Sequence, residues 1–306
     1  MESSNGVVFA ADIGGPMDIS NEYRWNVPVV TYGFDQSFLN YFGTNGVAAV
    51  ENAIQILNDL PPASQMVLTN FPFDSHYYNL TAEAQNLYDL KSQTLSLLLE
   101  QMELAQPTRY IFVLRQWNVV FIPPSPNAFR APFDWPDWVY PDFMSQRNFD
   151  PQTLEASTYV NNTLYSAYIS SQAGQNVMVP IIVNPFTGIY YNTVADNILD
   201  SGGYYVGLTY DDIGGLCYLY STNNVNYETL LPGVFGVGTN ADSLVNGAWR
   251  PGVDKITFIP QSINSLTGEF LPMTNYFTDH YIINNVLMQQ QVARIISQPE
   301  FLLSVC

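Results

Sequence analysis

The hydrophobic pattern of the first hundred residues changes from a strand period to a helix period. Residues 27–34 (VPVVTYGF) are apolar and β-branched, which predicts a strand, and the turn-rich stretch 35–46 predicts a connection. Apolar residues then recur every three or four positions over 47–57, which predicts an amphipathic helix. The same period predicts a second helix over 82–104, with Thr81 as its N-cap.

After the second helix the strand period returns and dominates. Residues 108–122 predict a strand, so the first part of the chain reads as β-α-α-β. Strand-like runs follow at 163–170, 176–184 and 188–194, and the turn residues between them predict a β-meander. Short strands are expected around Val234 and at 256–259.

Two further helices are expected in the second half. The stretch LTYDDIGGLCYLYST (208–222) predicts a helix whose first-turn N–H groups are capped by Thr209 or Asp211, because a side-chain oxygen can accept them. Apolar residues over 283–296, before Pro299, predict a C-terminal helix.

These elements predict an α+β fold. An N-terminal β-α-α-β portion with two amphipathic helices, residues 1–150, is expected to precede a β-rich portion with a C-terminal helix, residues 151–306. The boundary is placed near Asp150, and a single domain is the alternative, because 306 residues are enough for one large core or two ordinary ones.

The end of the first portion is rich in proline and aromatic residues. Segment 123–151 resists regular structure, and long loops with so many aromatic side chains belong to functional sites or interfaces. We therefore expect this segment to carry interface residues: Trp135, Trp138, Tyr140 and Phe143. A carbohydrate-binding module that stacks sugars on Trp135, Trp138 and Tyr140 is one alternative function.

The composition excludes two classes of partner. Nine Lys and Arg against 27 Asp and Glu give a net charge of -18, which repels nucleic acid and anionic lipid. No apolar run approaches the ~20 residues of a membrane-spanning helix. A low charged fraction of 12% with abundant Tyr and Asn favours an extracellular or cell-surface location, although the apolar run near the start is shorter than the ~7 residues that a signal peptide needs. Cys217 and Cys306 are too few for a disulfide framework; one bridge, an intermolecular bridge and two thiols all stay open.

Candidate chemistry is sparse. The two histidines, His76 and His280, lie in different contexts, and the nucleophile motifs of serine hydrolases are absent, which predicts a protein that is not an enzyme. Carboxylates leave two alternatives. A hydrolase could use the clustered Asp134, Asp137, Asp211 and Asp212, and a calcium ion could use the hard oxygen ligands of Asp196, Asp200, Asp211 and Asp212. Calcium is the one cofactor left open.

Three separated pieces of the chain, residues 27–57, 96–107 and 208–222, together resemble the catalytic domain of matrixin-type metallopeptidases of the metzincin group. Residues 27–57 look like its opening strand and first helix, and 208–222 look like its final loop and helix. Residues 96–107 (SLLLEQMELAQP) fall where the zinc motif HExxHxxGxxHP would lie. Pieces of the chain are also similar to long secreted bacterial proteins, which implies secretion.

The resemblance implies a scaffold that has lost its zinc. The three zinc histidines would fall on Ser96, Glu100 and Gln106, the general base on Leu97, and the turn glycine on Glu103. A metzincin zinc needs three imidazoles and a carboxylate that activates water, and this sequence has neither set. We therefore expect a non-catalytic extracellular structural or self-assembling protein that acts through protein contacts, with itself or with other extracellular proteins, and with glycans as a further alternative.

Overall fold

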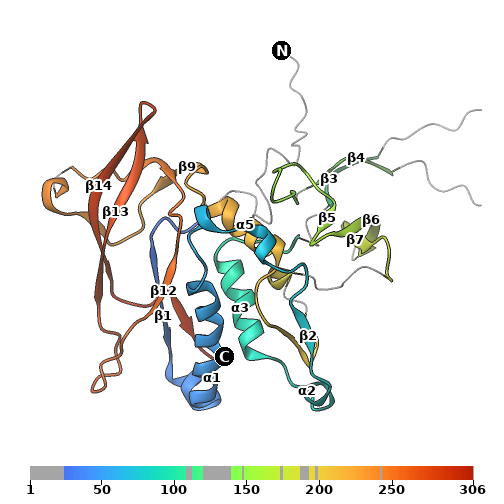
Figure 1. Ribbon diagram of the computed structural model, residues 1–306, viewed down its shortest axis with the longest axis horizontal. Coiled ribbons are helices and arrows are strands. Elements are labelled where there is room, and N and C mark those ends of the chain that lie inside the picture. The colour runs from blue at the N-terminus through green and yellow to red at the C-terminus, as the bar shows by residue number, and fades with distance from the viewer. Residues whose placement is uncertain are drawn as a thin grey trace, which may run out of the picture.

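The computed structural model describes residues 24–107, 112–119, 139–146, 148–172, 175–186, 193–196, 199–241 and 243–305. It has helices in the N-terminal part and mostly strands in the C-terminal part, so the predicted α+β class is confirmed (Figure 1). No helix of the described residues is long and apolar enough to cross a membrane.

The centre of the molecule is a small parallel sheet packed on helices. Strand β1 (Val29–Phe34) lies between β12 (Thr257–Pro260) and β15 (Phe301–Leu303) and is parallel to both. Helices α1 (Gln36–Asn58), α3 (Leu90–Gln101) and α5 (Tyr210–Tyr220) contribute buried side chains to one apolar core with this sheet. The core therefore takes residues from both sides of Asp150, while the predicted boundary there stays a prediction.

Helix α1 begins earlier than the sequence pattern predicts. The prediction of a turn-rich connection over 35–46 is wrong, because Asp35 caps the helix by accepting the N–H of Phe38 at 2.9 Å. Phe38 is buried, and its ring lies 4.9 Å from that of Phe42, so this first turn already contributes to the core. Gly43, at φ 60°, interrupts the helical backbone inside the stretch predicted as a connection, four residues before the predicted start of the helix at Val47.

The second predicted helix, over 82–104, is divided in two. Helix α2 (Leu80–Ala84) is capped by Asn79 rather than Thr81, and α3 starts at its own cap, Asp89. Asn86 between them has φ 59°, a left-handed conformation that ends a helix. By contrast, α5 forms as predicted, with Thr209 as N-cap in a capping box with Asp212.

The predicted C-terminal helix over 283–296 is wrong, because these residues form a strand. Strands β13 (Met273–Ile283) and β14 (Val286–Ile296) pair antiparallel along their whole length. Asn284 and Asn285 both have positive φ, which is the two-residue turn that joins right-twisted strands. The hairpin belongs to a five-stranded sheet in the order β10-β14-β13-β11-β9, whose other members are β9 (Val225–Thr229), β10 (Val234–Gly236) and β11 (Gly247–Pro251).

The remaining strands form small two- and three-stranded sheets. β2 (His76–Tyr78) pairs with β8 (Gly203–Tyr205), and β5 (Tyr159–Val160), β6 (Thr163–Gln172) and β7 (Gln175–Ile182) form a sheet that confirms the first two runs of the meander. The third run, 188–194, lies largely outside the described residues. Short 3-10 turns span Ala63–Gln65, Leu68–Asn70, Val194–Asp196 and Gly238–Asn240.

The proline- and aromatic-rich segment is not wholly irregular, contrary to prediction. Strand β4 (Val139–Gln146) pairs antiparallel with β3 (Phe112–Val119), and Pro141 lies opposite Trp117. A proline is compatible with a two-stranded ribbon because its missing N–H can lie on the outer edge. In Figure 1 strands β3 to β7 lie together on one side of the helices, and the five-stranded sheet lies on the other.

Candidate functional site

The paired aspartates at the start of α5, Asp211 and Asp212, are buried, and their carboxylates accept hydrogen bonds from other groups of the protein. The Asp212 carboxylate accepts the hydroxyl of Thr209 at 2.6 Å and backbone N–H groups of Thr209, Val194 and Ala195 at 2.9 to 3.1 Å. Burial raises the pKa of Asp212, and these hydrogen bonds oppose the rise by favouring the charged form. Asp212 therefore fastens the turn at residues 194–195 to the helix.

Asp211 fastens a different segment. Its carboxylate accepts the N–H of Asn161, and its own N–H donates to the Asn161 side chain at 2.9 Å. Burial raises the Asp211 pKa to about 7, a rise that the Asn161 N–H opposes and the nearby charges of Asp212 and Asp150 increase. Asp211 also lines a pocket of about 270 Å³ with Asp150 and Tyr210.

The other predicted carboxylate sites are not assembled in the described part of the chain. No three His, Cys, Asp or Glu side chains there could hold a metal ion together. Asp200 is exposed, and the side chain of Asp196 lies outside the described residues, as do Asp134 and Asp137. The calcium and hydrolase alternatives thus stay predictions for the undescribed carboxylates.

The two histidines are held by different sheets. His76 lies on β2 with its ring 6.0 Å from that of Tyr205, whereas His280 lies on β13. Of the predicted interface residues, Trp135 and Trp138 lie outside the described residues, and Tyr140 and Phe143 are placed on β4 by their backbone alone. Cys217 is half-buried, burial raises its pKa to about 11, and Cys306 lies outside the described residues.

The five-stranded sheet carries its charged residues on its buried face. We call this the inner face; its charged residues are Glu228, Arg250, Asp279 and Arg294, and it also holds the buried Gln290. Arg250 donates two bonds to the Asp279 carboxylate at 2.8 and 3.0 Å and three more to backbone carbonyls, so every guanidinium N–H is used. Gln290 donates a further bond to Asp279 at 2.7 Å.

The opposite, outer face of the same sheet has no formal charge among its strand positions. Because side chains alternate between faces and paired residues share a face, the register assigns this face. The outer face comprises Val225, Tyr227, Thr229, Phe235, Gly247, Trp249, Pro251, Thr274, Tyr276, Thr278, His280, Ile282, Leu287, Gln289, Gln291, Ala293 and Ile295. Its aromatic members are exposed, for example Tyr276 to 70% and Trp249 to 52%, whereas Ile282 is half-buried.

Two rows of apolar side chains cross this outer face. In one, the rings of Tyr227 and Trp249 meet edge to face with centroids 5.8 Å apart, and Ile282 and Leu287 continue the row. In the other, Phe235, Ala293 and Tyr276 lie side by side on neighbouring strands. The face is therefore apolar and aromatic with threonine and glutamine between the rows.

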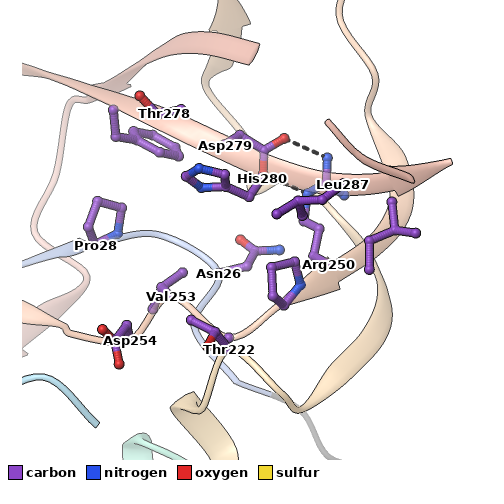
Figure 2. Close-up of a pocket in the computed structure, with 14 residues that line it drawn as sticks. Asn26, Pro28, Thr222, Arg250, Val253, Asp254, Thr278, Asp279, His280 and Leu287 are labelled. Atoms are coloured by element: carbon purple, nitrogen blue, oxygen red, sulfur yellow. Dashed lines mark hydrogen bonds and ion pairs between the residues drawn. The ribbon is translucent and has the colours of Figure 1, made fainter. Parts of the chain in front are cut away.

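A cleft of about 570 Å³ lies where β11 separates from β13. One side is β13 from Phe277 to His280, and the other is formed by the chain after β11, Gly252 to Asp254, with Asn26 and Pro28 between them (Figure 2). Figure 2 shows the His280 ring and the Asn26 side chain within this space, while Asp279 is turned to Arg250. The cleft holds no set of groups arranged as nucleophile, base and orienting partner.

The outer face and the cleft were missed by the sequence interpretation. The signal was present: in β13 the even-numbered residues 274–282 are uncharged, while Asp279 lies on the odd-numbered side. The pattern was not recognised because residues 283–296 were predicted as a helix. Without a partner strand for residues 273–283, no exposed sheet face could be predicted. No family model, curated protein or solved structure matches the chain in comparisons with known proteins.

The metzincin resemblance consequently stays a prediction. Glu103, at the position of the turn glycine, has φ 70°, which is the backbone region that favours glycine. Ser96, at the position of the first zinc histidine, is buried, whereas Leu97 is half exposed.

Proposed function

We propose that this is a non-catalytic structural protein that associates with further copies of itself through the outer face, outside the cell or at its surface. One observation carries the proposal: a chain of net charge -18 has an exposed sheet face on which aromatic and aliphatic residues stand among Thr, Gln and His, with no Asp, Glu, Lys or Arg. Aromatic enrichment with charge depletion is the composition of an interface centre.

Charge also favours a second copy as the partner. Two copies of an acidic chain repel each other wherever their carboxylates approach, and an uncharged face is where that repulsion is smallest. Among the described side chains, Arg24, Arg250 and Arg294 form ion pairs within the molecule, so these three cations do not attract the carboxylates of a second copy. Contact between two outer faces would bury aromatic rings without burying an unpaired charge.

The test is a matched pair of substitutions. Tyr276 on the outer face and Tyr88 between α2 and α3 are exposed to 70% and 62%, and replacing either by lysine changes the net charge equally. Light scattering after size-exclusion chromatography should show assemblies for the parent and for Tyr88→Lys, and a shift to monomers for Tyr276→Lys. The added lysine lowers the net negative charge, so a loss of association cannot come from increased overall repulsion.

Any one of four results would contradict the proposal. The parent could be monomeric at every concentration tested, or Tyr276→Lys could associate as strongly as Tyr88→Lys. Hydrolysis of a peptide or glycoside substrate that Asp211→Asn abolishes would show that the protein is an enzyme. An outer face that instead retains a different protein or a glycan would replace self-association by another partner.

A further inference from the structure

Strand β13 has one edge paired throughout and another that is mostly open. Ile283 and Val286 flank the two-residue turn and so exchange hydrogen bonds, and every second residue back from Ile283 bonds to β14 in the same way. The backbone N–H and C=O groups of Thr278, His280 and Ile282 therefore point to the other side, toward β11.

Of Thr278, His280 and Ile282, Ile282 alone pairs with β11. Ile282 is paired with Trp249, and β11 then ends at Pro251. Over the described residues, the backbone groups of Thr278 and His280 form no hydrogen bond on this side. An open strand edge is a template for another extended chain, because it offers a row of donors and acceptors at the spacing of a β-ladder.

A second, independent group in the cleft also needs a partner. Asn26 lines the cleft and is only 8% exposed; its Nδ2 donates to the Thr229 carbonyl at 2.8 Å, but its Oδ1 accepts no bond from the described residues. A buried acceptor without a donor destabilises the fold, and a peptide N–H in the cleft would supply the missing donor.

We propose that the cleft binds an extended peptide strand that pairs with β13 at Thr278 and His280, and that the strand is residues 6–11 (GVVFAA) of the same chain. This segment is uncharged and apolar, and its central residues Val7, Val8 and Phe9 have high β-propensity, which suits a strand beside the apolar walls of the cleft, Pro28, Val253 and Phe277. The observations that carry this proposal are the open edge of β13 and the Oδ1 atom of Asn26 rather than association, although Thr278 and His280 also belong to the outer face.

Position along the chain favours this occupant over an unrelated peptide. The described chain begins at Arg24, and Asn26 already lines the cleft. The twelve residues between the segment and Arg24 can span up to about 40 Å when extended, so the segment can reach the cleft from its own tether. Tethering makes the binding intramolecular, with an effective concentration near ~1 mM for a short flexible linker.

Hydrogen exchange at single-residue resolution tests the proposal in the full chain. The double variant V7P/V8P removes two N–H groups from the segment, and the matched control V7A/V8A keeps them while removing the same branched side chains. The amides of Thr278 and His280 should exchange more than about tenfold faster in V7P/V8P than in V7A/V8A. The amides of Phe277 and Asp279, which bond to β14, should exchange equally in both variants and so show that the hairpin stays folded.

Each alternative outcome has a defined meaning. Equal exchange of the Thr278 and His280 amides in both variants overturns the proposal, whatever the state of association. Protection that weakens on dilution overturns the intramolecular occupant and assigns the strand to a second copy. Protection that is independent of concentration in the control and lost in V7P/V8P supports the proposal even if the protein proves monomeric.

Discussion

At the scale of single residues, we expect the carboxylate of Asp212 to contribute strongly to the stability of the fold. Its carboxylate joins the cap of α5 to the turn at residues 194–195 through four hydrogen bonds. Asp212→Ala should lower the free energy of unfolding by about 3 kcal/mol, because several buried donors lose their acceptor together. Urea denaturation measures this loss. The exposed Asp200→Ala is the control, expected to stay within about 0.5 kcal/mol of the parent; an equal loss in both variants would contradict this role.

Asp211 gives the protein a dependence on pH that can be measured by difference. Its pKa is raised to about 7 in the folded protein from 3.8, so the folded state holds a proton that the unfolded state has released. The resulting stabilisation is complete below pH ~4, is lost as the pH rises to ~7, and is flat above that. Asp211→Asn imitates the protonated form and should be more stable than the parent at pH 8, by roughly 2–4 kcal/mol.

The measurement is urea denaturation of the parent and of Asp211→Asn at a series of pH values. The two proteins should converge toward pH 4, since every other titrating group is common to both. A variant less stable than the parent at pH 8 would show that the ionised carboxylate is required for the bond from Asn161.

For Thr209, Asp211 and Asp212, only the contacts between residues close in sequence could be predicted. Thr209 as the cap of α5 could be predicted, because the capping box joins residues three apart. The bonds of Asp212 to Val194 and Ala195, and of Asp211 to Asn161, connect positions far apart in the chain. No local pattern encodes such contacts, and the same carboxylates were consequently proposed as calcium ligands.

At the scale of elements, the β13–β14 turn offers a test of backbone strain. Asn285 has φ 61°, in the second position of a turn where glycine is preferred. Asn285→Gly should raise the melting temperature slightly, with a gain of about 0.5 kcal/mol, since glycine adopts this conformation without steric cost. Asn285→Val should lower it, because a β-branched residue is disfavoured there. Changes of the same sign in both variants would contradict the assigned turn.

The same hairpin shows why one element was predicted wrongly. Residues 283–296 contain apolar residues at spacings that suit a helix as well as a strand. Residues 286–296 form a strand because they pair with residues 273–283. The pattern of one segment alone does not contain information about such a partner. The prediction for helix α1 was wrong only at its N-terminal end, because Asp35 was not recognised as a cap and residues 36–46 were assigned to a connection.

At the scale of the whole molecule, the distribution of charge predicts how association depends on salt. If copies meet through the outer face, their remaining acidic surfaces still repel, and salt screens that repulsion. Raising the ionic strength from about 0.01 M to 1 M shortens the Debye length from ~30 Å to ~3 Å, so the mean mass measured by light scattering should increase. A mass that falls with salt would show that charged contacts, not the outer face, hold the copies together.

The fold class was predictable at this scale, and the candidate site was not. Composition and local periods were enough for an α+β chain with its helices early and its strands late. The outer face requires the order of five strands, and the cleft requires the point at which β11 leaves β13. Both are consequences of pairing between distant segments, which one sequence does not show.

Most of the described lysine and arginine side chains are held by contacts within the molecule, which limits how readily they react with enzymes and reagents in solution. Arg24, Arg250 and Arg294 are held in buried ion pairs, and Lys255 donates its ammonium group to the carbonyls of Asn58 and Leu60 at the end of α1. Among the basic residues whose side chains the structure describes, this leaves Lys91, at the start of α3, outside such contacts. While the protein stays folded, trypsin, which cleaves after lysine and arginine, should therefore cut slowly after Arg24, Arg250, Lys255 and Arg294. Amine-reactive labels should react faster with Lys91 than with Lys255, because the Lys255 ammonium group is already bonded to two carbonyls.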